Sequence, residues 1–190
     1  MSTTAIVLAA DSGLDFVCPK YLVSVHGEPM LQHVVNDVTD WPVDHVIVVL
    51  GSNAEQIIET IDFGDLTVVI DPEWSEGTAS PIRAALDLAS RDRSTRRCVI
   101  TRGDQPSIDA EMIEVLIDAA TEQEADAAVL KYRYAIGWPI VLDRSVWEHL
   151  IGSEGSVDLL DVVVSRASTV AEVWVDHRPP VTFETSEDLP

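Results

Sequence analysis

The first apolar run of the chain constrains its fold more than any other feature. Residues 5–10 read Ala-Ile-Val-Leu-Ala-Ala, which is too short for a helix and rich in the residues of a buried parallel strand. The run ends at Asp11, Ser12 and Gly13, a cluster of turn-forming residues. Because α/β sheets place their ligand sites where strands open onto such loops, we expect a site to begin here.

The same pattern continues through the first two thirds of the chain. Apolar runs at 46–50, 66–70 and 98–101 predict three more strands, and they alternate with four amphipathic helices. Asp109 is placed to cap the fourth helix, and residues 51–53 are placed to cap the second. Ile57, Ile58 and Ile61 are the apolar residues of that second helix.

The order of elements changes after residue 125. The remaining runs predict strands at 125–134, 138–142 and 170–175, two short helices before the last of these, and an edge strand at 181–183. The sequence therefore predicts a three-layer α/β fold in one domain over residues 1–190. Its sheet is expected to be mostly parallel, with an antiparallel addition in the C-terminal half.

The charge of the chain limits its partners. There are 33 acidic residues against 12 lysines and arginines, giving a formal charge of −21, which excludes nucleic acid and anionic membranes as partners. No apolar run approaches the roughly 18–20 residues that span a bilayer. The chain starts directly with its first strand, so we expect a cytoplasmic location. Two widely separated cysteines, Cys18 and Cys98, exclude a metal site built on cysteine.

Three polar loops follow predicted parallel strands, at 11–20, 71–78 and 102–107, and should meet at one sheet edge. Asp104 suits a divalent cation, although an aspartate here could also stabilise the turn. Lys20 could meet a phosphate or lie in solvent. The segment 73–80 could receive an anion or a ribose, or simply start a helix. Trp74 and Trp138 are candidates to pack on a base, but core positions are the commoner reading.

Six segments in this order resemble the MobA-like NTP transferases, the molybdenum-cofactor guanylyl- and cytidylyltransferases. They include the Leu-Ala-Ala opening with its downstream lysine, the Asp-Pro-x-Trp-x-x-Gly loop and the Gly-Asp-Gln-Pro turn. The segments are 8–20, 27–31, 71–77, 103–106, 137–139 and 184–189. The resemblance covers nearly the whole chain and implies the GT-A type of nucleotide-binding fold.

The resemblance also implies a reaction. It is the Mg²⁺-dependent transfer of a nucleoside monophosphate from CTP or GTP to a phosphorylated small molecule of the molybdopterin type, with release of pyrophosphate. Asp104 and Lys20 would be the catalytic residues, and Asp104 with Glu184 would hold the metal. The implied nucleotide-binding residues are Leu8, Ala9, Ala10, Ser12, Gly13, Lys20, Asp71, Gly77, Thr78, Ser80 and Arg102.

The opening loop departs from the family pattern. Asp11 stands for its first glycine, Asp15 for its arginine and Val17 for its second glycine, so acids lie where a triphosphate is expected. One such like-charge contact at about 4 Å costs roughly 4 kcal/mol. Further along, Asp158 replaces an acceptor-side arginine.

These changes leave two readings open. Arg102 or Arg83 could supply the missing guanidinium, or Asp11 and Asp15 could bind an additional cation, and the chain is then an enzyme. Alternatively, the chain has lost transferase activity and acts as a binding protein for a protein partner.

Overall fold

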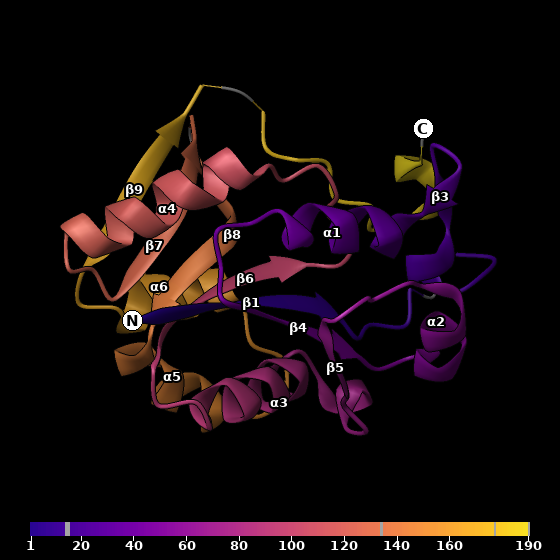
Figure 1. Ribbon diagram of the computed structural model, residues 1–190, viewed down its shortest axis with the longest axis horizontal. Coiled ribbons are helices and arrows are strands. Elements are labelled where there is room, and N and C mark those ends of the chain that lie inside the picture. Colours follow the sequence, from indigo (N-terminus) through magenta and orange to yellow (C-terminus); the bar gives the residue numbers. More distant parts are fainter. Residues whose placement is uncertain (14–15, 134, 177, 190) are drawn as a thin grey trace.

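The computed structural model describes residues 1–13, 16–133, 135–176 and 178–189. Within them, seven strands form one sheet in the order β5-β4-β1-β6-β8-β7-β9 (Figure 1). The strands are β1 (Ser2–Ala9), β4 (His45–Leu50), β5 (Thr67–Ile70), β6 (Thr95–Arg102), β7 (Ala127–Tyr132), β8 (Ala135–Asp143) and β9 (Val170–Val175). A short hairpin, β2 (Ser24–Val25) with β3 (Glu28–Pro29), lies apart from this sheet.

The sheet is mostly parallel, as predicted. Strand β1 pairs in parallel with β4 and β6, and β4 pairs in parallel with β5. Strand β8 is antiparallel to both β6 and β7, while β7 and β9 are parallel to each other. The antiparallel addition therefore consists of β8, inserted between two strands that run the other way.

Helices cover both faces of the sheet (Figure 1). They are α1 (Met30–Thr39), α2 (Ala54–Thr60), α3 (Ala79–Ser90), α4 (Ala110–Glu122), α5 (Arg144–Ile151) and α6 (Leu159–Arg166). Short 3-10 turns lie at Lys20–Leu22, Trp74–Glu76 and Ser186–Asp188.

Alternate residues of the strands pack into two separate hydrophobic cores, one on each face of the sheet. Ala5 and Val7 of β1 belong to the core under α1, α2 and α4, whereas Ile6 between them belongs to the core under α3, α5 and α6. This alternation follows from the two-residue period of a strand. It explains why the buried strands are apolar at every position, since each of their faces meets a helix layer.

Several local predictions are confirmed and two are wrong. Asp109 caps α4 by accepting a hydrogen bond from the Met112 amide at 2.8 Å. Asn53 precedes α2 in a left-handed conformation and makes no side-chain cap, because its amide donates to the Ser52 hydroxyl instead. Within α2, Ile57 is buried and Ile58 is exposed, so only part of the apolar set packs on the core.

The second wrong prediction is the edge strand at 181–183. Phe183 instead donates its amide to the Asp104 carbonyl at 3.0 Å and buries its ring in a small cluster with Val25 and Met30. Because this segment packs against the loop after β6, it has no strand partner. The C-terminal residues therefore cover the carboxyl end of β6.

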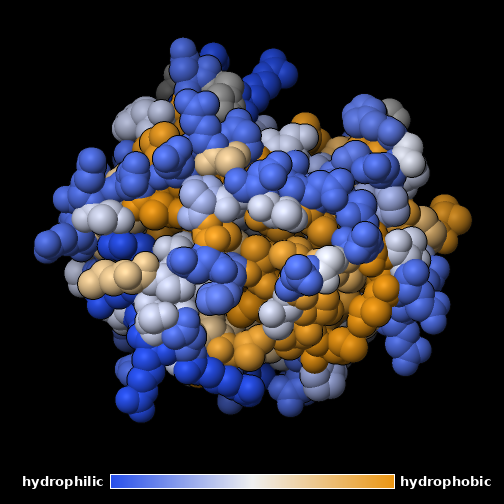
Figure 2. Space-filling model, viewed as in Figure 1, coloured by the Kyte–Doolittle hydropathy of each residue, from blue (hydrophilic) through white to orange (hydrophobic). Residues whose placement is uncertain are grey.

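Strand β5 forms one edge of the sheet. On the face shown in Figure 2, apolar colour gathers around this edge, and Ile70 of β5 is 51% exposed. Among the described residues, no helix is long and apolar enough to cross a membrane.

Candidate functional site

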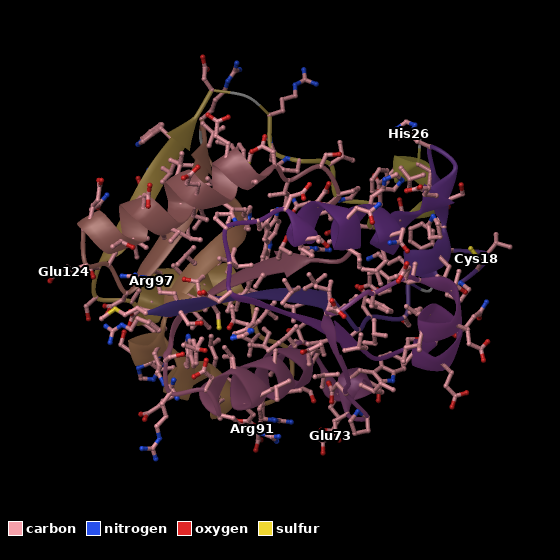
Figure 3. The ribbon with its side chains drawn as sticks, viewed as in Figure 1. Cys18, His26, Glu73, Arg91, Arg97 and Glu124 are labelled. Carbon is pink, nitrogen blue, oxygen red and sulfur yellow. The ribbon has the colours of Figure 1, made fainter. Side chains whose placement is uncertain are left out.

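The three polar loops meet in one cavity at the carboxyl ends of β1, β5 and β6. The cavity has a volume of about 880 Å³. The carboxyl ends point to the right in Figure 1, the side on which Cys18 projects in Figure 3, while Arg97 and Glu124 lie at the opposite end. The prediction that these loops converge is confirmed.

The two sides of the cavity differ in chemistry. One side carries charge from Asp11, Arg102 and Asp104, with Tyr21 beside them. The other side is mainly apolar and is formed by Trp74, Pro81, Ile82, Trp138, Val157, Leu159 and Leu160. Both tryptophans are partly buried and line the cavity. Trp138 also packs against the core under α3, α5 and α6, so the reading as core residues holds for Trp138 and is wrong for Trp74.

Asp104 is the centre of the charged side. Its residue is 1% exposed, and its two carboxylate oxygens accept three hydrogen bonds. Arg102 donates from Nε to Oδ1 and from Nη2 to Oδ2, both at 2.8 Å, and Lys20 donates from Nζ to Oδ2 at 2.6 Å. Two cations from different strand ends therefore converge on one buried carboxylate.

Two further acids extend this network. Asp11 accepts from Lys20 Nζ at 3.2 Å and from the Tyr21 hydroxyl at 2.9 Å. Glu184 lies 3.1 Å from Arg102 Nη2. The order is Asp11, Lys20, Asp104, Arg102, Glu184, so three carboxylates alternate with two cations. We call these five residues the charge network.

The network shifts the pKa values of its buried members. Burial alone would raise the pKa of Asp104, but the Arg102 guanidinium and the Lys20 ammonium outweigh it and hold that pKa below its usual value. The hydrogen bond to Asp104 raises the pKa of Arg102. Burial, with the charges of Asp11 and Asp104, raises the pKa of Tyr21, so its hydroxyl stays a donor. Asp104 is therefore an ionised acceptor at neutral pH.

The opening loop holds Lys20 in place. Gly13 has φ +53°, and a Cβ there would lie 2.3 Å from Lys20 Cβ, so only glycine allows this approach. Leu8, Ala10 and Ser12 line the cavity, and Ala9 is buried in the core. Val17 is fully exposed. The predicted departure at Asp15 lies outside the described residues.

The loop after β5 forms another wall. Gly77 and Thr78 line the cavity, and the Thr78 hydroxyl both donates to and accepts from the backbone of Val157, at 2.8 and 2.7 Å. Gly77 has φ +135°, and a Cβ there would lie 2.3 Å from the Gly155 carbonyl oxygen. The close approach of these two segments therefore closes this side of the cavity.

Asp71 and Ser80 lie behind that wall rather than in it. Asp71 Oδ1 accepts from the Ser80 hydroxyl at 2.9 Å and from the Glu73 amide at 3.0 Å. Asp71 Oδ2 is buried and has no hydrogen-bond partner among the described residues. Ser80 lines a second cavity of about 450 Å³ with Arg83, which pairs with Glu73 at 2.7 Å. Of the two candidate replacement arginines, Arg102 is therefore the one in the main cavity.

Some contributors were absent from the sequence interpretation. Tyr21 follows Lys20 and reads as an ordinary core aromatic, so no sequence signal pointed to its bond with Asp11. Leu159 and Leu160 were assigned only to a helix, although that helix starts at the cavity wall. Asp158, expected as an acid in place of an acceptor-side base, caps α6 by accepting from the Leu160 and Asp161 amides.

The residues fit a divalent cation that a substrate shares. Among the residues that the structure describes, no three histidine, cysteine, aspartate or glutamate side chains are grouped to hold a metal. Asp104 nevertheless offers an ionised carboxylate on the cavity wall. Asp11, a second carboxylate on that wall, pairs with the same lysine, Lys20. Mg²⁺ at nucleotide sites takes one or two carboxylates and completes its shell with phosphates and water. Glu184 reaches this site through Arg102 and is not among the cavity-lining residues.

Known proteins share this architecture. The family model of the MobA-like NTP transferase domain matches residues 5–177. The bifunctional protein GlmU of Lactococcus lactis subsp. lactis (strain IL1403) is 34% identical over 133 residues, which are 68% of this chain and 28% of that protein. The chain therefore matches little more than a quarter of that relative's length.

Solved structures agree with the family model. The homologue of Mycobacterium tuberculosis Rv0371c from Mycobacterium sp. strain JC1 is 27% identical with a TM-score of 0.87, over 98% of this chain and 92% of that one. Rv0371c of M. tuberculosis H37Rv in complex with manganese has a TM-score of 0.83 at 24% identity, over 99% and 96%. On the match over residues 5–177, this chain belongs to the MobA-like NTP transferase family.

Proposed function

We propose that this chain is a Mg²⁺-dependent nucleotidyltransferase, acting as one domain in the cytoplasm. It transfers a nucleoside monophosphate from CTP or GTP to the phosphate of a small molecule of the molybdopterin type. The observation that carries the proposal is the buried Asp104, held by Lys20 and Arg102 on the charged side of a cavity whose other side is apolar. A nucleotide and a phosphorylated acceptor have this same division between charged and apolar parts.

The acceptor is the nucleophile in this reaction. One of its phosphate oxygens attacks the α-phosphorus of the nucleotide, a new P–O bond forms, and the bond from that phosphorus to the bridging oxygen breaks as pyrophosphate leaves. A cation bound at Asp104 supplies charge neutralisation on the phosphates. The protein contributes alignment and electrostatic compensation rather than covalent chemistry.

The side chains have separate parts in this scheme. Lys20 is buried and does not itself line the cavity, but its ammonium bonds to Asp11 and Asp104, which do; in this scheme it turns an N–H to a phosphate oxygen. The opening loop meets the phosphates at Leu8, Ala10 and Ser12, which line the cavity, while Gly13 makes room for the Lys20 stem. The loop 71–80 contacts the base or the ribose through the residues that line the cavity, Trp74, Gly77 and Thr78.

The experiment measures pyrophosphate release and nucleotide binding together. Wild-type protein is incubated with CTP or GTP, MgCl₂ and molybdopterin, beside Asp104→Asn and the control Asp118→Asn, which changes an exposed acid on α4. We expect release with one nucleotide, loss of release in Asp104→Asn and normal release in Asp118→Asn. Absence of nucleotide binding at every MgCl₂ concentration would refute the proposal.

One observation favours a second function. The charge network holds three carboxylates and two cations, so without a metal it carries a surplus of negative charge. A member that has lost transfer would keep the fold and serve a protein partner. The same experiment separates the two functions, because that protein releases no pyrophosphate with any nucleotide.

A further inference from the structure

Arg102 occupies the carboxylate that the proposed function gives to the metal. Its Nε and Nη2 donate to the two oxygens of Asp104, both at 2.8 Å, and Nη2 also lies 3.1 Å from Glu184. Its remaining nitrogen, Nη1, hydrogen-bonds to none of the described residues. Arg102 itself lines the 880 Å³ cavity. The guanidinium therefore binds carboxylates through Nε and Nη2, whereas the N–H groups of Nη1 have no partner among the described residues. Arg102 lies on the cavity wall, so these N–H groups are close to a ligand in the cavity.

The forked contact excludes a metal from the same place. A guanidinium that bonds both oxygens covers the side of a carboxylate on which a single cation could reach both of them. A divalent cation at Asp104 would also lie within a few ångströms of the guanidinium, and like charges so close repel. Lys20 also donates a hydrogen bond to Oδ2. Asp104 therefore cannot bind a metal through both oxygens while Arg102 stays in this position.

Arg102 is the cation that is able to leave. The Lys20 side chain is 5% exposed, and Gly13 packs directly against its stem. Lys20 also keeps a second carboxylate, Asp11. The Arg102 side chain is 29% exposed and its outer partner, Glu184, is itself mostly exposed. A small rotation of Arg102 therefore needs no rearrangement of the core, whereas release of Lys20 does.

We propose that Arg102 is an exchangeable cation, which holds Asp104 while no metal is bound and turns to the phosphates of the nucleotide once a metal takes that carboxylate. The inference rests on the proposed function, because it uses the same metal ligand. It gives the cavity a guanidinium for the phosphates although the opening loop carries Asp15 where the family has arginine. It also makes metal and triphosphate bind cooperatively, because each favours the released position of Arg102.

The test uses Mn²⁺ as the metal and inorganic tripolyphosphate as a base-independent phosphate. Free Mn²⁺ is followed by electron paramagnetic resonance during titration of wild type, Arg102→Met and the control Arg93→Met. Arg93 is exposed in the turn before the amino end of β6, so its removal changes net charge equally without touching Asp104. We expect Arg102→Met to bind Mn²⁺ alone at least tenfold more tightly than wild type, and Arg93→Met to bind like wild type.

The second arm measures the coupling. In wild type, saturating tripolyphosphate should tighten Mn²⁺ binding at least tenfold, and in Arg102→Met most of this gain should vanish. Arg102→Lys keeps the charge without the fork and should bind Mn²⁺ with an intermediate Kd, which keeps the test valid if Arg102→Met unfolds. Binding of Mn²⁺ by both Arg102 variants no tighter than by wild type overturns the exchange. Because these titrations need neither CTP, GTP nor turnover, the exchange can fail while Asp104-dependent pyrophosphate release persists.

Discussion

The chain has only two lysines, and each pairs with a carboxylate in a different environment. Lys20 is buried against the buried Asp104, whereas the ion pair of Lys131 with Glu172 lies at the surface. We predict that Lys20→Met destabilises the protein strongly and that Lys131→Met does not. The two substitutions are chemically identical, so burial is what distinguishes them.

The magnitude follows from the geometry. At 2.6 Å and an effective dielectric of about 20, the attraction between Lys20 and Asp104 is about 6 kcal/mol. The desolvation of both groups opposes this, and removing one partner of a buried pair costs about 3–5 kcal/mol in measured cases. Because Arg102 still holds Asp104 in Lys20→Met, we expect a loss of about 3 kcal/mol. For a chain of this length that lowers the melting temperature by about 6–12 °C.

Urea denaturation gives the free energy of unfolding for wild type, Lys20→Met, Asp104→Asn and the double variant. The double variant should lose at least about 1 kcal/mol less than the sum of the single losses, because each single change leaves a buried charge with one partner fewer. Lys131→Met should lose about 1 kcal/mol or less, as surface ion pairs do. Equal losses for the two lysines, or additive losses in the double variant, refute the buried charge pair as a source of stability.

Three further outcomes follow from the site and the charge. Gly77→Ala should lose about 1–3 kcal/mol of stability and weaken nucleotide binding, because a φ of +135° strains any side chain and the new Cβ would meet Gly155. The control Gly64→Ala, at φ +52° with open space around it, should bind nucleotide normally. Calorimetry measures nucleotide binding by both variants. Sodium chloride should raise the melting temperature by screening the net charge of −21, and a steady fall with salt contradicts this. Burial would raise the pKa of Asp104, but Arg102 and Lys20 outweigh burial and lower it. The stability that the ionised carboxylate contributes is therefore complete above about pH 4 and is lost as the pH falls through the lowered pKa. In urea titrations, the difference in unfolding free energy between wild type and Asp104→Asn should narrow below about pH 4.

Local sequence patterns predicted the sheet because they carry the physics that forms it. The runs at 5–10 and 46–50 are apolar because strands covered on both faces need apolar residues throughout, whereas the run at 66–70 forms the edge strand β5 and is only partly buried. The convergence of the loops after them then follows from parallel strands alone. The segment 181–183 failed because its partner, the Asp104 carbonyl, lies far away in sequence and leaves no periodic trace.

The charge network was only partly predictable. Arg102 and Asp104 are two residues apart, which places both on the same side of an extended chain. Their ion pair could therefore have been predicted from the sequence. The contact of Asp104 with Lys20 joins the opening loop to the loop after β6, and that of Asp11 with Tyr21 joins two separate positions of the opening segment. Such contacts depend on how the loop folds back over the sheet, which no residue pattern encodes.

The acid at position 11 has a different meaning in the structure than in the sequence. From its place in the family pattern, Asp11 adds negative charge where a triphosphate is expected, at a cost of roughly 4 kcal/mol for one contact. Its carboxylate instead accepts from Lys20 and from the neutral Tyr21 hydroxyl, so part of its charge is compensated within the wall. Glu184 has the same relation to Arg102 on the other side of Asp104. Asp11 and Glu184 therefore hold the two cations of the site in position, and the net effect on an anion depends on whether Arg102 stays with Asp104. This makes the divalent cation the deciding variable for the site: it reverses the surplus of one negative charge in the network and competes for the carboxylate that restrains the guanidinium.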